Sequence, residues 1–309
     1  MLGYFIKNFF NNLYVVMLNA FYFLRFYYKA NKGYFDKDHQ NSLVKDGWNV
    51  TFHDEFNKPI DFDNKWNKWY SERTLHKPDV VPSLNSLDCI EVKNNQLHLY
   101  TKTNEDYPNK SDYPLKTGWL ASVPTPYWEN GKLMNKGFNQ QYGYFETNCK
   151  VPPNGLTFWA AFWLYGANWP PEIDIFEFMS GEDVGTDKTK GISMTTHWGS
   201  ENKFGMKKAT QLGRTLRKFL GISVNFNEHF HTYACKWEWD YIEWYIDNVA
   251  VYRSPFNVPD CQMHIVISNG AKVGKLPKPH QMPQDFIVNY VRAYKKIQQY
   301  EKEINNILG

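Results

Sequence analysis

Three acidic residues, Glu172, Asp174 and Glu177, lie in a stretch that has the pattern of a β-strand. Between Trp169 and Gly181, β-branched and aromatic residues alternate with the acids, and Pro-Pro and Ser-Gly mark the two ends. Residues two apart share a strand face, which places Glu172 beside Asp174. A one-residue bulge near Ile175–Phe176 would return Glu177 to that face. The spacing therefore predicts three carboxylates in a row, called the acid row below.

Cleavage of a glycosidic bond is the chemistry that such a row suits. One carboxylate must be ionised to attack the sugar, and a second must hold a proton for the leaving oxygen. Close spacing of like charges raises the pKa of one member and keeps the proton there. The alternative is a solvated strand face without chemistry. Aromatic residues just upstream favour glycoside chemistry, because sugar rings stack on aromatic faces: Trp159, Phe162, Trp163 and Trp169.

The sequence Glu-Ile-Asp-Ile-Phe-Glu at 172–177 resembles the bulged Glu-x-Asp-x-x-Glu signature of glycoside hydrolase family 16. Further segments resemble the family in the same order: 51–57, 141–146, 155–163, 231–239, 244–248 and 288–294. The resemblance covers roughly residues 48–295. It implies an all-β fold, an antiparallel two-sheet β-sandwich of the jelly-roll, concanavalin A-like type. One concave face of that sandwich would be an open cleft for an extended polysaccharide.

The resemblance also implies roles for individual residues. Glu172 would attack the anomeric carbon, Glu177 would act as acid and then base, and Asp174 would position Glu172, so that hydrolysis retains configuration. The implied substrate contacts are Trp159, Trp163, His197 and Trp198. The bulged signature favours a 1,3- or 1,3/1,4-β-glucan or an algal-type galactan. The alternative is a non-catalytic glycan-binding or structural assembly protein on the same fold.

No cofactor is expected for catalysis, but the family often carries a structural calcium. Glu55 is an acidic candidate ligand near the opening strand, and Asn289 stands where an aspartate is usual. A neutral carbonyl oxygen can still bind calcium, with less charge to hold it.

Composition excludes some other classes. The net charge is +3 and no dense Lys/Arg block dominates the motif region, so nucleic acid is not an expected partner. The four cysteines are widely spaced without a Cys-x-x-Cys, which is not a zinc pattern. Buried free thiols are expected, and one disulfide remains open. Aromatic residues make up 18% of the chain, which suits both sugar stacking and a sandwich core.

Residues 1–30 form a predicted hydrophobic helix. Its polar residues fall within one arc of about 140°, which leaves a wide apolar face; they are Lys7, Asn8, Asn11, Asn12, Asn19 and Arg25. Three interpretations stay open: a signal peptide, a membrane anchor, and a helix docked in a partner or larger assembly. Each of them predicts an extracellular or surface-associated protein.

The rest of the chain divides into a polar linker (31–47), a catalytic domain (48–295) and a short helical tail (296–309). A linker at 31–47 predicts that a chain starting near Asn41 folds and stays active. The basic segment from Lys203 to Lys218 is interpreted as a solvated loop. The alternative is an insertion at the cleft edge that attracts an anionic glycan.

Overall fold

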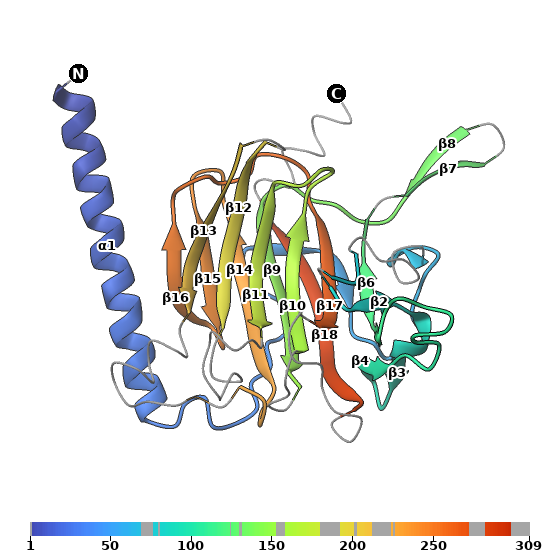
Figure 1. Ribbon diagram of the computed structural model, residues 1–309. Helices are drawn as coiled ribbons and strands as arrows, with labels where there is room; N and C mark the ends of the chain where they lie inside the picture. The colour runs from blue at the N-terminus through green and yellow to red at the C-terminus, as the bar shows by residue number, and fades with distance from the viewer. Residues whose placement is uncertain are drawn as a thin grey trace.

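The computed structural model describes residues 2–68, 77–79, 81–123, 125–129, 132–152, 158–179, 192–200, 203–211, 224, 226–271 and 282–297. In these residues, two stacked and mostly antiparallel sheets make up the body, and helix α1 (Leu2–Asn31) stands along one side (Figure 1). The predicted two-sheet β-sandwich is confirmed. The described residues also include a 3₁₀ turn at Leu87–Cys89.

The larger sheet has ten strands. Its main path is β16 (Val249–Ser254), β15 (Ile242–Ile246), β14 (His231–Trp237), β9 (Gly143–Lys150), β18 (Gln284–Lys296), β4 (Gln96–Thr103), β5 (Leu115–Thr117) and β2 (Ser83–Asn85). Two further strands pair beside this path: β1 (Trp48–Asp54) with β18, and β3 (Ile90–Lys93) with β4. The tight turns predicted at Asn94-Asn95 and Asp247-Asn248 are confirmed by positive φ angles at all four residues.

The smaller sheet has six strands and carries the acid row. Its order is β13 (Lys203–Gln211), β12 (Ser193–Ser200), β11 (Glu172–Met179), β10 (Phe158–Tyr165), β17 (His264–Ala271) and β6 (Trp119–Ala121). A separate hairpin, β7 (Thr125–Glu129) with β8 (Lys132–Lys136), projects from the body beyond β6 (Figure 1). The acid row therefore lies on a central strand, between neighbours that can supply substrate contacts.

The hydrophobic core fills the space between the two sheets. Phe176 of β11 packs against Tyr233 of the larger sheet, with ring centroids 4.4 Å apart, and edge-on against Phe286 at 6.1 Å. In β10 the alternate residues Phe158, Ala160, Phe162 and Leu164 are buried in this core. Because strand side chains alternate, the core on one face of β10 and β11 leaves Trp159, Trp163 and the acids on the other.

Helix α1 packs on the exposed edge of the larger sheet, along β16. The Asn19 amide bonds both backbone groups of Arg253, donating to its carbonyl oxygen at 3.0 Å and accepting from its N–H at 2.8 Å. Tyr22 donates a hydrogen bond of 2.6 Å to Glu243, and Phe26 is fully buried. The helix thus covers a strand edge that would otherwise present unpaired backbone groups.

The segment after the helix, predicted as a polar linker, is tied to the larger sheet. Phe35 is buried against Phe26, with ring centroids 4.6 Å apart. The Asn41 side chain donates to Glu146 at 2.9 Å, and its backbone N–H donates to the Tyr290 hydroxyl at 3.1 Å. Residues 32–47 therefore contribute side chains to the domain on which they lie.

Two other sequence interpretations can be compared with the fold. The interpretation of Lys203–Lys218 as a loop is wrong for residues 203–211, which form the edge strand β13; residues 212–223 lie outside the described part. The predicted helical tail lies outside it too, apart from 296–297. All four cysteines are free, and Cys89, Cys149 and Cys235 are the buried thiols that the sequence predicts.

Candidate active site

The acid row is brought to one face by a bulge in β11. On the β10 side, Phe162 pairs with Phe176 and Trp163 pairs with Asp174, so Ile175 is the extra residue. The ladder with β12 shifts in the same interval, between Asp174 and Glu177. The bulge predicted near Ile175–Phe176 is confirmed.

A side chain from the facing sheet supports this bulge. A bulge disrupts the ladder locally and leaves backbone groups in need of other partners. The indole N–H of Trp244, which is fully buried on β15, donates to the carbonyl oxygen of Asp174 at 3.0 Å. The irregular backbone that aligns the acids is thereby tied to the core of the sandwich.

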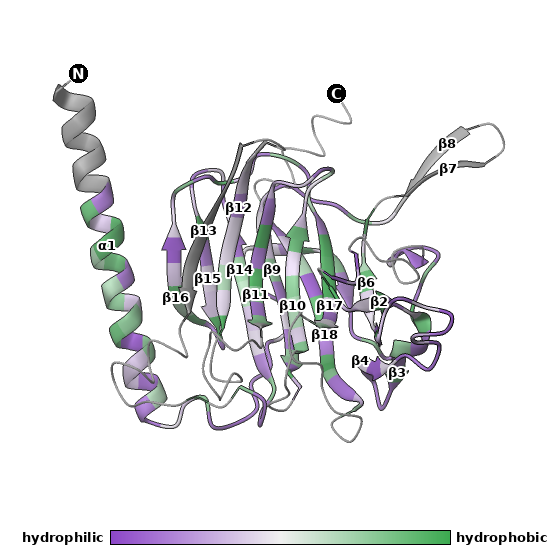
Figure 2. Cartoon of the chain, viewed as in Figure 1, coloured by the Kyte–Doolittle hydropathy of each residue, from purple (hydrophilic) through white to green (hydrophobic). Residues whose placement is uncertain are grey.

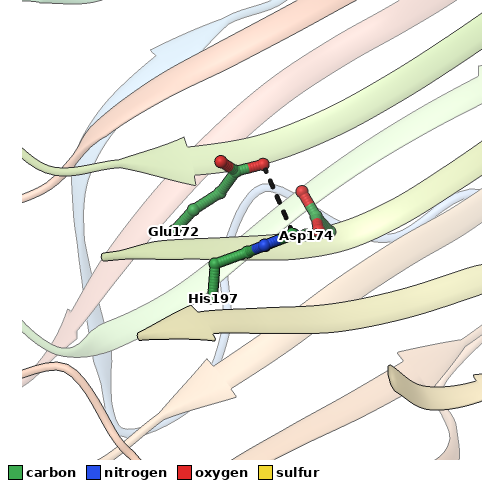
Figure 3. Close-up of side chains that lie close together, drawn as sticks. All are labelled: Glu172, Asp174 and His197. Carbon is green, nitrogen blue, oxygen red and sulfur yellow. Dashed lines mark hydrogen bonds and ion pairs between the residues drawn. The ribbon is translucent and has the colours of Figure 1, made fainter. Parts of the chain in front are cut away.

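Each member of the acid row has a nitrogen donor beside it. The Trp169 indole donates to Glu172 at 2.7 Å, and the Trp159 indole donates to Glu177 at 2.9 Å. His197 Nε2 lies 3.2 Å from Asp174 Oδ2 and 4.0 Å from Glu172 Oε1 (Figure 3). The two outer carboxylates are thus held by indoles, and the middle one by an imidazole.

Burial and like charge set the protonation of the row. Burial raises the pKa of Glu172 well above its ordinary value, and the charge of Asp174 raises it further. Burial also raises the pKa of Asp174, with a further increase from Glu177. The side chain of Asp174 is within hydrogen-bonding reach of both glutamates, so one proton can be shared along the row.

Two neighbours oppose the raised pKa of Glu172. A positive charge on His197, when the ring is protonated, and the hydrogen bond from Trp169 both favour the ionised form of Glu172. Burial lowers the pKa of His197 itself, which favours a neutral imidazole near pH 7. A neutral ring that donates from Nε2 to Asp174 carries its proton on that nitrogen. In that tautomer His197 acts on the row as a hydrogen-bond donor.

Aromatic side chains continue the face of the acid row across β10, β17 and β6. Trp163 makes edge-on contacts with Trp119 at 5.5 Å and with Tyr165 at 5.6 Å between ring centroids. Tyr165 in turn contacts His264 at 5.5 Å. Of these rings, Trp119, Trp163 and Tyr165 are half-buried, whereas His264 is buried.

Four residues near the acid row are not among the contacts that the sequence predicts: Trp169, Trp119, Tyr165 and His264. Tyr165 could have been found from strand alternation, because it follows Trp163 by two. Trp169 stands three residues before Glu172, so proximity was its signal. Trp119 and His264 come from strands distant in the sequence and carry no local signal.

The other expected contacts fall on both sides of the sheet. Trp159, Trp163 and His197 share the face of the acid row, with His197 paired directly opposite Glu172. Trp198 is the next residue along β12, so its side chain points away from that face. The structure brings three of the four predicted contacts to the acids.

The expected calcium ligands have other partners. Both carboxylate oxygens of Glu55 accept hydrogen bonds of 2.8 Å from the Arg292 guanidinium. The side-chain oxygen of Asn289 accepts from Gln96 at 2.9 Å, and its nitrogen donates to Asn148 at 2.5 Å. A guanidinium that engages Glu55 in a bidentate pair takes the place a cation would need, so this donor set does not fit calcium. The structural calcium remains a prediction of the resemblance alone.

Among the described residues, the donor atoms that lie close enough together to hold a metal ion are those of Glu172, Asp174 and His197, within 4.8 Å of one another. They are also the groups of the acid row and its imidazole, whose hydrogen bonds are given above. The candidate metal-binding cluster therefore coincides with the acid row.

Known proteins resemble this chain in sequence. The sequence profile of glycosyl hydrolases family 16 matches residues 85–269. Endo-1,3-1,4-beta-glycanase ExsH of Rhizobium meliloti (strain 1021) is 30% identical over 162 residues, which are 51% of this chain and 31% of that protein. Beta-1,3-glucan-binding protein of Penaeus monodon is 29% identical over 141 residues, 43% of this chain and 37% of that protein. The chain spans about a third of the length of these relatives.

A solved structure resembles it in fold. The catalytic domain of an endo-1,3-beta-glucanase (laminarinase) from Thermotoga petrophila RKU-1 superimposes with a TM-score of 0.61 at 19% identity, covering 82% of this chain and 100% of that one. The profile match takes in more than half of the chain, including β10, β11 and β12 with the whole acid row. The chain belongs to glycosyl hydrolases family 16.

Proposed function

We propose that this protein is a retaining endo-glycoside hydrolase that cleaves an internal β-linkage of an extended polysaccharide. The substrate class is a 1,3- or 1,3/1,4-β-glucan or an algal-type galactan. The observation that carries the proposal is the acid row, in which Asp174 lies between two glutamates that are each held by an indole. A protein that only bound glycan would have no physical need to bury three carboxylates side by side.

In the proposed first step, Glu172 attacks the anomeric carbon and Glu177 gives a proton to the leaving oxygen. A covalent glycosyl-enzyme forms as the glycosidic bond breaks. Trp169 supports attack by Glu172, because its hydrogen bond stabilises the ionised carboxylate; His197 does the same only while its ring is protonated. Asp174 holds the carboxylate in place and takes part in sharing the proton.

In the second step, Glu177 removes a proton from water, which attacks the same carbon and releases Glu172. The two displacements together retain the configuration of the sugar. The indole of Trp159 fixes the Glu177 carboxyl in both steps through its 2.9 Å hydrogen bond.

Release of reducing ends from a panel of β-glucans and galactans tests the proposal. The expected result is activity on at least one polymer, with products of intermediate length early in the reaction. Retention on a polysaccharide column without reducing-end release would favour a non-catalytic glycan-binding protein instead. The Penaeus monodon relative is named for such a function, as a beta-1,3-glucan-binding protein.

The pH profile should reveal the hydrogen bond from Trp169. This bond lowers the pKa of Glu172, so Trp169→Phe should raise it. Because Glu172 must be ionised to attack, activity is lost as the pH falls through that pKa. The acidic limb of kcat/KM should therefore move to higher pH in the variant. Trp163→Phe is the matched control, since the Trp163 indole bonds Ser268 and not an acid. If the acidic limb of kcat/KM lay at the same pH in Trp169→Phe as in wild type, the role given to this hydrogen bond would be contradicted.

The basic strand β13 offers a test of substrate charge. Lys207 and Lys208 lie in β13, paired with Thr196 and Thr195 of the strand that carries His197; Arg214 lies outside the described residues. If this segment attracts an anionic glycan, replacing all three with Ala should raise KM for a sulfated or uronic-acid polymer several-fold at low salt. Turnover should barely change. A neutral glucan is the control. Equal salt dependence of wild type and variant on every charged polymer would leave β13 without this role.

A further inference from the structure

The face of α1 that points away from the sheets is apolar. Five residues on it are between 44% and 64% exposed: Leu13, Met17, Phe21, Leu24 and Tyr28. At 3.6 residues per turn they fall within an arc of about 80°. They are called the outward face of α1 below, and Val16 at 65% exposed extends it. Large apolar side chains in such a row are unusual on a soluble surface and mark an interaction site.

The sheet holds the opposite side of the helix. Asn19, Tyr22 and Phe26 make the contacts with the sandwich, and they lie about 180° around the helix from the outward face. An amphipathic helix at a protein surface normally turns its apolar stripe inward. Here the amide of Asn19 bonds the β16 edge, and a second apolar stripe, the outward face, is left exposed. Figure 2 shows apolar residues along the described part of α1, at the side of the molecule.

The charges on the helix favour one kind of partner. Residues 2–31 contain no Asp or Glu, and their charged residues are Lys7, Arg25 and Lys29. Arg25 is exposed beside the outward face, and Lys29 lies over the Tyr34 ring at 3.6 Å. A second copy of the helix packed face to face would bring like charges together. An anionic lipid surface would attract Arg25 and also take up the apolar side chains of the outward face.

We propose that α1 binds the surface of an anionic lipid bilayer through its outward face, with its axis along the membrane plane. None of the helices in the described part of the chain meets the length and hydropathy needed to cross a bilayer. The bonds from Asn19 and Tyr22 then make the helix a fixed arm, which holds the sandwich beside the lipid surface. This proposal is independent of the hydrolase activity, because it uses no residue of the acid row.

Co-sedimentation of the full chain with vesicles tests the proposal. One set of vesicles is pure phosphatidylcholine, and the other contains phosphatidylserine as well. Wild type should bind the anionic vesicles, more weakly at high salt. The triple variant Met17→Glu, Phe21→Glu, Leu24→Glu should lose at least about tenfold in partition, because it places charge on the face that enters the lipid. Arg25→Gln should weaken binding to anionic vesicles only.

The matched control is Val44→Glu, which should bind as wild type does; Val44 is an apolar residue outside α1 and is 77% exposed. Thermal unfolding of every variant should match wild type, because the substituted side chains are exposed. Failure of wild type to bind either set of vesicles would overturn the proposal. A concentration-dependent dimer that the triple variant dissociates, without vesicle binding, would overturn it in favour of an interface between two copies.

Discussion

Glu172→Gln and Glu177→Gln are each expected to abolish hydrolysis, with kcat reduced on the order of a thousandfold or more. In the proposed mechanism Glu172 supplies the attacking carboxylate and Glu177 the proton, and an amide can do neither. Reducing-end release on the best polymer of the panel measures the effect. Hydrolysis near the wild-type rate in either variant would remove that residue from the mechanism.

Azide should separate the two roles. A small anion can take the place of a lost nucleophile, so Glu172→Ala should be rescued with inverted product. In Glu177→Ala azide replaces water in the second step, and the rescued product should retain configuration. The reverse pattern would exchange the roles of the two residues.

Glu172→Gln should also change the stability of the folded protein, in a direction that the raised pKa of Glu172 predicts. The pKa of Glu172 is raised in the folded protein, so the folded state binds a proton more tightly than the unfolded one. Stability from this group is present at pH below its ordinary pKa and is lost as the pH rises through the raised pKa. Glu172→Gln should therefore unfold at a higher temperature than wild type at pH 7, with a smaller difference near pH 4. If the difference in unfolding temperature between variant and wild type were the same at pH 4 and pH 7, burial of the Glu172 charge would not be its cause.

A chain that begins near Asn41 is expected to fold poorly, contrary to the prediction from the sequence. It lacks Phe26 and Phe35, which are 0% and 1% exposed in the core, and it uncovers the β16 edge that Asn19 bonds. Loss of two buried Phe side chains costs about 6–10 kcal/mol, comparable with the whole stability of a domain. Low solubility and a large fall in unfolding temperature should follow.

A chain that begins near Asn12 is the control for this truncation, because it keeps Asn19, Tyr22, Phe26 and Phe35. It should unfold close to the full-length temperature. The point variant Phe26→Ala should lose about 3–5 kcal/mol, measured by denaturant unfolding. If the chain that begins near Asn41 were soluble and unfolded at the full-length temperature, the helix would add nothing to the stability of the sandwich.

The sequence alone determined the parts of this protein that depend on local pattern. Alternation identified β10 and β11, and the spacing from Glu172 to Glu177 required a bulge because a regular strand would have turned Glu177 into the core. Paired asparagines at 94–95 located a tight turn, since they tolerate positive φ. The ordered resemblance from the opening to the last strand indicated the sandwich as a whole. All of these signals lie within a few residues of the feature they predict.

Only the tertiary structure decided which distant side chains meet. Trp244 reaches the Asp174 carbonyl from the facing sheet, and Arg292 takes both oxygens of Glu55, a residue 237 positions away in the chain. Neither contact follows from periodicity, because it depends on how two sheets stack. The direction of α1 was undetermined for the same reason. Periodicity placed Asn19 in a polar stripe, but only the fold shows that Asn19 bonds the open backbone groups of β16 while Met17, Phe21 and Leu24 are left exposed.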